Sequence, residues 1–274
     1  MFDWMIFWVL TAICIPGVLI TVPGTIKMLG KVARDKLPPG KEMPPMPVLV
    51  IASVLQSLVV LAVPAAIGTA VAHRVGLRAP FFEALLGGAP LWPALQPQLL
   101  PTLVVGIAGA LAFVAMYYGL FRPWLDQDTR EHWDELRNGL GIWARLLYGG
   151  IAEEVLTRWG LMSLLVWLGA LAFGRPSPAL VWAAILVSGV LFGLGHAPSY
   201  LAAGCHKTPS FFGAMIALNL WASLIFGWLF WQYGLLAAIV AHMLFHLVWW
   251  PFDLHFYRST ASQPDLALKK NVSQ

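Results

Sequence analysis

The chain has 274 residues, of which 59% are hydrophobic and 11% are charged, and its formal net charge is +4. Charged side chains usually make up about a quarter of a soluble domain, so this composition excludes a soluble globular fold. The positive excess lies beside long apolar runs, where it sets membrane topology, so we do not expect nucleic-acid binding. The lipid bilayer is the expected surrounding of this protein.

Seven apolar runs are long enough to cross a bilayer, which takes about 20 residues in a helix. They are continuously apolar rather than alternating, which favours helices over the strands of a membrane β-barrel. The runs cover residues 4–22, 48–72, 99–121, 143–173, 179–196, 211–231 and 235–250. The sequence therefore predicts an all-α, polytopic bundle of about seven spanning helices. It forms one membrane domain over residues 1–274, with a polar C-terminal tail over residues 252–274.

Three segments need a separate interpretation. Residues 80–98 are rich in Pro, Gly and Trp, which predicts an interfacial or re-entrant loop. Residues 124–140 combine five acidic residues with Trp133 and Leu136, which predicts an amphipathic interfacial helix with a solvated acidic face. A straight helix over residues 143–173 would measure about 46 Å, so we expect it to tilt, protrude or bend at Gly149-Gly150.

Lys and Arg are distributed unevenly between the two sides of the predicted bundle. With seven spans, twelve of them fall in alternate connections and the C-terminal tail, whereas Arg74, Arg78 and Arg175 fall on the other side. Because positive residues concentrate on the cytoplasmic side, we predict a multi-pass protein of the cell membrane. Its N-terminus is then external and its C-terminus cytoplasmic.

Of the 13 acidic residues, only Glu153 and Glu154 lie inside a predicted span, where a charged carboxylate is costly. Arg158 follows Glu154 by four residues on the same helical face, so these two side chains can form an ion pair. The five-residue offset turns Glu153 away from Arg158. Glu153 is then left to face a polar cavity, as a general base requires.

Three of the seven histidines fall within predicted spans. His196 ends one span, and His242 and His246 lie four residues apart on one face of another. A single interior histidine is commonly a structural residue. Three interior histidines and Glu153, however, would each need a separate polar partner inside the bundle unless they met at one site. On the predicted topology all four lie on the cytoplasmic side, which favours one water-accessible site that opens to the cytoplasm.

These residues resemble the CPBP family of CAAX prenyl proteases and bacteriocin-processing or immunity proteins, the glutamic-type intramembrane proteases. The family motif EExxxR reads EEVLTR over residues 153–158, and FxxxH reads FGLGH over residues 192–196. The third motif is usually HxxxN or HxxxD, whereas this chain has His242 followed by His246. By this resemblance, residues 141–250 are the motif-bearing catalytic core.

The resemblance implies that Glu153 and His196 activate a water molecule that attacks the scissile carbonyl. It implies further that His242 and His246 bind the oxyanion, and that Glu154 and Arg158 support the site. The unusual His246 opens an alternative in which His196, His242, His246 and Glu153 hold Zn²⁺. No HExxH motif is present, so catalysis without a metal or other cofactor is the preferred interpretation.

The preferred function is therefore an intramembrane endopeptidase of the CAAX-protease type. Its partners would be the lipid bilayer and a membrane-associated peptide or protein, cleaved near its C-terminus. Two other classes stay open: a non-catalytic immunity or scaffold protein with the same fold, and a proton-coupled transporter that uses the same ionisable residues. Intact Glu153 and His196 argue against the first, and the lack of repeated halves argues against the second.

Overall fold

The computed structural model describes residues 2–35 and 42–261, which form helices and no strand. Seven helical stretches within these residues are long and apolar enough to cross a membrane, so the predicted all-α polytopic bundle is confirmed. The elements in chain order are α1 (Trp4–Asp35), α2 (Met46–Val71), η1 (Ala72–Val75), α3 (Pro80–Leu86), α4 (Leu91–Met116), η2 (Tyr117–Phe121), η3 (Arg122–Trp124), α5 (Gln127–Ala144), η4 (Arg145–Ala152), η5 (Val155–Met162), α6 (Ser163–Phe173), α7 (Pro178–Ala203), α8 (Pro209–Tyr233) and α9 (Leu235–Ala261).

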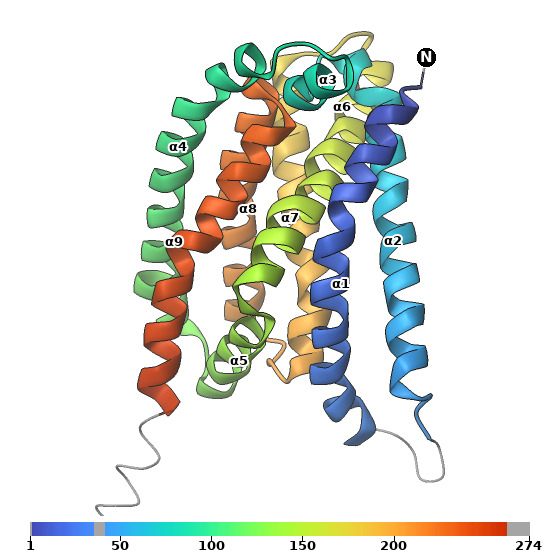
Figure 1. Cartoon of the computed structure of the whole chain (residues 1–274). Coiled ribbons are helices and arrows are strands. Elements are labelled where there is room, and N and C mark those ends of the chain that lie inside the picture. The colour runs from blue at the N-terminus through green and yellow to red at the C-terminus, as the bar shows by residue number, and fades with distance from the viewer. Residues whose placement is uncertain (1, 36–41, 262–274) are drawn as a thin grey trace, which may run out of the picture.

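The long helices run up and down between two ends of the bundle (Figure 1). The N-terminus and α3 lie at one end, which we call the α3 end. The last turns of α1, the first turns of α2, the start of α5 and the last turns of α9 lie at the other, the α5 end. An odd number of spans places the first and last helical residues at opposite ends.

The chain turns sharply between the amphipathic helix and the fourth span, but at Gly141 rather than at the predicted Gly149-Gly150. Gly141 has φ 70° and ψ 166°, a conformation that favours glycine. The span then continues through two π-helical segments, η4 and η5. Gly149 and Gly150 serve close packing instead, because a Cβ on either would come within 2.5 Å of a side chain of α9.

The segment predicted as a loop over residues 80–98 is largely helical, so that interpretation is wrong. It contains α3 and the first two turns of α4, which begins at Leu91. Pro93 lies in the first turn of α4, where backbone amides lack an intrahelical partner in any case. Pro97 and Pro101 lie farther inside the helix, and prolines of this kind are tolerated in spanning helices.

The first two helices pack directly against the π-helical segments. A Cβ on Gly68 of α2 would lie 2.3 Å from the backbone oxygen of Trp159 in η5. A Cβ on Gly17 of α1 would lie 2.6 Å from the backbone oxygen of Leu147 in η4. The N-terminal helices therefore support the segment that carries Glu153 and Glu154.

Helix α5 begins with a side-chain cap. The carboxylate of Asp126 accepts a hydrogen bond from the backbone amide of Thr129 at 2.9 Å, and this bond holds the pKa of Asp126 below its ordinary value.

The nearby Cys205 is buried, and burial raises the pKa of its thiol to about 12. Cys14 and Cys205 are both free thiols.

Two acidic residues that the sequence placed in water are buried. Asp134 of α5 is 4% exposed, although a solvated acidic face was expected there. Asp253 is 1% exposed because α9 continues past residue 250 as far as Ala261, inside the segment expected to form the polar tail. Both carboxylates face arginines, which removes the cost of burying them alone. The rest of the expected tail, residues 262–274, lies outside the described residues.

Candidate active site

Glu153 and Glu154 lie at the junction of η4 and η5, and their carboxylates point into different surroundings. The Glu154 side chain is fully buried, whereas that of Glu153 is 19% exposed and lines a cavity. Widened π-helical turns often occur at functional sites, and here they flank both glutamates. The two neighbours are therefore suited to different roles.

Glu154 forms two interactions inside the bundle. Its Oε2 lies 3.3 Å from Nε of Arg158, the ion pair expected from their four-residue spacing. Its Oε1 lies 2.7 Å from Nδ1 of His242 on α9, a contact that the sequence analysis missed. An ionised carboxylate can only accept, so Nδ1 donates this hydrogen bond and Nε2 of His242 is directed to the other side of the ring.

Glu153 faces two histidine rings from two other helices. Its Oε1 lies 3.8 Å from Nε2 of His196 on α7, and its Oε2 lies 3.8 Å from Nε2 of His242. Both separations exceed a direct hydrogen bond and match a spacing that one water molecule can bridge. Nδ1 of His196 lies 2.8 Å from the carbonyl oxygen of Phe192, an acceptor only, so the neutral ring presents its Nε2 lone pair to Glu153.

Aromatic rings fix the orientation of the polar groups. Phe226 stacks on His242 at 4.6 Å between ring centroids, and Phe192 meets His196 edge-on at 4.5 Å. The same two phenylalanines flank the guanidinium of Arg158, which lies 5.4 Å from the Phe226 ring and 5.9 Å from the Phe192 ring. Phe192 of the FxxxH motif thus packs against two polar residues of the site.

His246 lies one helical turn beyond His242 and does not contact Glu153. Its ring stacks on His242 at 4.9 Å with an interplanar angle of 24°. Neither ring nitrogen has a hydrogen-bond partner among the described residues. The ring also lies against Gly149, and this glycine leaves it the space to line the cavity.

The four residues of the zinc alternative do not converge in this arrangement. Within the described part of the chain, no group of three or more His, Cys, Asp or Glu side chains is arranged to hold a metal ion. The lone pairs of an imidazole lie in its ring plane, so the nearly parallel, stacked His242 and His246 do not point at one ion. Nδ1 of His242 is in addition bonded to Glu154.

One cavity of about 420 Å³ joins these residues. Glu153, His196, His242 and His246 line it, together with residues of α1, α2, α4, α5 and α8. Among the described residues that form its wall, Glu153 is the only carboxylate. The cavity therefore offers one exposed base beside two imidazole rings in otherwise largely apolar surroundings.

Two arginines that were not predicted as site residues, Arg137 and Arg145, also line this cavity. They pair with Asp253 of α9. A signal was present in the sequence, because His242, His246, Trp249 and Asp253 recur at helical spacing and therefore lie on one face of α9. The apolar run ends at residue 250, so the predicted span did not extend to Asp253.

Residues 137–248 match the family model described as Rce1-like, type II CAAX prenyl endopeptidase Rce1-like. The matched segment contains all seven residues of the three motifs and nearly coincides with the expected core over residues 141–250. Comparisons with curated proteins and with solved structures gave no match.

Proposed function

We propose that the chain is an intramembrane endopeptidase with Glu153 as its general base, and the match of residues 137–248 to the Rce1-like family model supports this proposal. The observation that carries this proposal is the position of Glu153, the only carboxylate among the described residues that line the cavity. The substrate we propose is a membrane-associated peptide or protein whose backbone reaches that carboxylate.

Water activation uses Glu153 together with His196. A water molecule between Glu153 Oε1 and His196 Nε2 donates one hydrogen bond to each, since both atoms are acceptors. Both protons of the water are then engaged, and its oxygen lone pairs are free to attack the scissile carbonyl carbon. Glu153 takes one proton as the C–O bond forms and returns it to the leaving nitrogen as the C–N bond breaks.

His242 supports the negative charge that develops on the carbonyl oxygen. When both ring nitrogens of His242 carry a proton, Nδ1 donates to Glu154 and Nε2 donates into the cavity. Donors aimed at a developing oxyanion in a dry site contribute on the order of 3 kcal/mol each. His246, with its free ring nitrogens, is the second donor that we propose.

This mechanism needs no metal ion. The stacked histidines and the bond between His242 and Glu154 support that choice, because they direct the nitrogens to different points. Glu154 orients His242 and Arg158 pairs with Glu154, and neither residue touches the substrate in this mechanism.

We propose that the cavity is reached from the cytoplasmic side. In the sequence, twelve Lys and Arg fall in alternate connections and the C-terminal tail, against three on the other side, and cytoplasmic sides of membrane bundles are rich in these residues. The N-terminus is then external and the C-terminus cytoplasmic.

A complementation experiment tests the proposed function. Cells that lack the gene receive the wild-type protein or Glu153→Gln, and the C-terminal fragments of membrane proteins are quantified by mass spectrometry. We expect at least one fragment that depends on the wild-type protein and that Glu153→Gln fails to restore at equal expression. A phenotype fully rescued by Glu153→Gln, with no fragment changed, would contradict the proposal and favour a non-catalytic role.

A further inference from the structure

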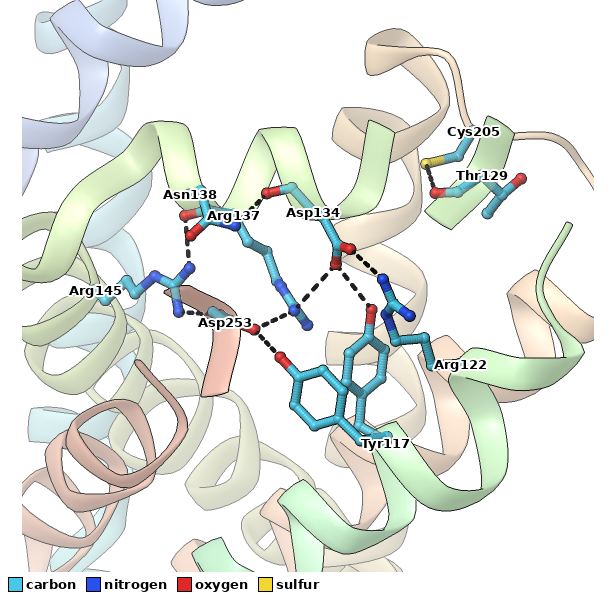
Figure 2. A network of polar contacts seen from close by, with 10 residues as sticks. Tyr117, Arg122, Thr129, Asp134, Arg137, Asn138, Arg145, Cys205 and Asp253 are labelled. Carbon is cyan, nitrogen blue, oxygen red and sulfur yellow. Dashed lines mark hydrogen bonds and ion pairs between the residues drawn. The ribbon is translucent and has the colours of Figure 1, made fainter. Parts of the chain in front are cut away.

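Two arginines inside the bundle meet their carboxylates in different ways. Arg145 donates a hydrogen bond from Nη1 to Asp253 at 2.6 Å, within the charged network shown in Figure 2. Arg158 is 1% exposed and lies beside Glu154, but its Nε, 3.3 Å from Oε2, forms no hydrogen bond there. The charge of Arg158 is therefore paired, while its N–H groups need another acceptor.

The acceptor that Arg158 uses is the hydroxyl of its neighbour in the chain. Nη1 of Arg158 donates to Oγ1 of the fully buried Thr157 at 2.7 Å. The Thr157 hydroxyl donates in turn to the backbone carbonyl oxygen of Glu153 at 2.5 Å. A guanidinium has only donors, so Thr157 must accept from it, and the hydroxyl proton is left for the carbonyl.

The bond from Arg158 distinguishes Thr157 from other threonines of the bundle. Thr25 and Thr69 also donate to the carbonyl oxygen four residues earlier, which is a common contact in helices. Neither of them accepts from a charged group among the described residues. Bonds from charged donors are stronger, and hydrogen bonds in a chain polarise one another. The contact with the Glu153 carbonyl is therefore stronger than an ordinary threonine contact.

This backbone contact matters because the Glu153 carboxylate has no direct bond of its own. Its two oxygens lie 3.8 Å from Nε2 of His196 and 3.8 Å from Nε2 of His242, and no other group of the described residues donates to them. The carboxylate position then follows from the backbone at residue 153, between two π-helical segments. A catalytic group must be held to within about 0.5 Å of its productive position.

We propose that Thr157 is a positioning residue, whose hydroxyl joins the backbone of Glu153 to the fixed side chain of Arg158. This inference rests on the proposed function, because it describes how the base of the same site is held. The guanidinium is itself held between the rings of Phe192 and Phe226, at 5.9 and 5.4 Å. Thr157 does not line the cavity, so it acts through Glu153 and not on the substrate.

Glu153 and Glu154 form the one Glu-Glu pair of the sequence, so the bond can be observed directly. The protein is made by cell-free synthesis with glutamate that carries carbon-13 at its backbone carbonyl and nitrogen-15, and is placed in lipid nanodiscs. The carbonyl carbon of residue 153 is then the only one bonded to a labelled nitrogen. Hydrogen bonding deshields a carbonyl carbon, so Thr157→Val should shift this NMR signal upfield, and Thr157→Ser should not. An unchanged signal in Thr157→Val would overturn the inference.

Turnover shows whether this bond positions the base. Thr157→Val keeps the shape of the side chain without its hydroxyl, so kcat should fall at least about tenfold while KM stays within about twofold. Thr157→Ser keeps the hydroxyl and should retain kcat within about threefold of wild type. An unchanged kcat in Thr157→Val would contradict a positioning role even if the NMR signal moves.

The matched control is Thr69→Val on α2, outside the cavity wall. Thr69 is also buried, donates to the carbonyl oxygen of Ala65 at 2.8 Å and accepts from Nε1 of Trp159 at 3.3 Å. Its loss should lower stability without lowering kcat. An equal fall of kcat in Thr69→Val and Thr157→Val would reduce Thr157 to a structural residue and overturn the inference.

A second variant covers the case in which Thr157→Val does not fold because Arg158 loses its acceptor. Thr157→Cys keeps a weak donor and acceptor, so it should shift the carbonyl signal upfield and lower kcat about threefold or more. Wild-type values of both would contradict the inference. The proposed function is tested separately, since Glu153→Gln decides the base by turnover alone, whereas the carbonyl signal is recorded without any substrate.

Discussion

His246 stands where the motif of the CPBP family, which this chain resembles, usually has Asn or Asp, and its unpartnered ring nitrogens line the cavity. If it only donates a hydrogen bond to the oxyanion, His246→Asn keeps a donor on the same helical face. We expect kcat/KM to stay within about tenfold of wild type, which is about 1.4 kcal/mol in the barrier. Turnover of purified protein, with zinc content measured before and after chelation, checks this. Stoichiometric zinc with chelator-sensitive activity, lost together in His246→Asn, would contradict the metal-free mechanism.

Glu154 balances Arg158 and orients His242, so its charge matters for stability as well as for chemistry. Glu154→Gln leaves a buried guanidinium without its carboxylate, and breaking a buried pair in this way costs about 3–5 kcal/mol. The matched control is Glu83→Gln, whose partner Arg78 is 60% exposed, and a surface pair of this kind is worth about 0–1 kcal/mol. Equal unfolding midpoints for the two variants in detergent would contradict this assignment.

At the residue level, sequence spacing identified the polar residues but only some of their partners. The four-residue offset predicted the pair of Glu154 and Arg158, because one helix contains both. The contact between Glu154 and His242 joins segments 88 residues apart, and no local periodicity encodes it. Asp134 was expected in water because an amphipathic pattern does not reveal that arginines cover one acidic residue of the polar face.

Contacts between elements depend on glycines where backbones approach. In Gly68→Ala the added Cβ would meet the backbone oxygen of Trp159 at 2.3 Å, so α2 must move away from η5. Overpacking of this kind costs about 1–3 kcal/mol. Gly213→Ala in α8 has open space around its Cβ and should be neutral or slightly stabilising, since alanine favours helices. Chemical unfolding of both variants tests the difference, and a Gly68→Ala protein as stable as Gly213→Ala would contradict the packing.

Element types were predictable from the sequence, whereas their ends and bends were less so. Apolar length determined all seven spans, because the bilayer imposes a minimum length on a helix. The turn at Gly141 and the π-helical segments depend on packing between helices, which hydropathy does not encode. Proline-rich residues 91–98 were expected in a loop because the usual cost of proline in a helix was given too much weight.

For the whole molecule, the distribution of Lys and Arg predicts which side of the membrane the site opens to. A cysteine placed at Ser262, in a background with Cys14 and Cys205 replaced, should react with a membrane-impermeant maleimide only after the cells are permeabilised. A cysteine at Arg175, between α6 and α7, should react in intact cells. Labelling of the Ser262→Cys protein in intact cells would reverse the proposed orientation and the side from which substrate arrives.

The most direct test of the account is turnover by purified protein in nanodiscs, with a membrane-anchored peptide substrate and solvent water as the nucleophile. Glu153→Gln should fold with the wild-type melting temperature and lose at least about 10²-fold in kcat, the contribution typical of a positioned general base. Glu83→Gln, an acidic residue at the α3 end outside the cavity wall, should keep wild-type turnover. Wild-type turnover in Glu153→Gln would contradict the account, because no other carboxylate of the described residues lines the cavity.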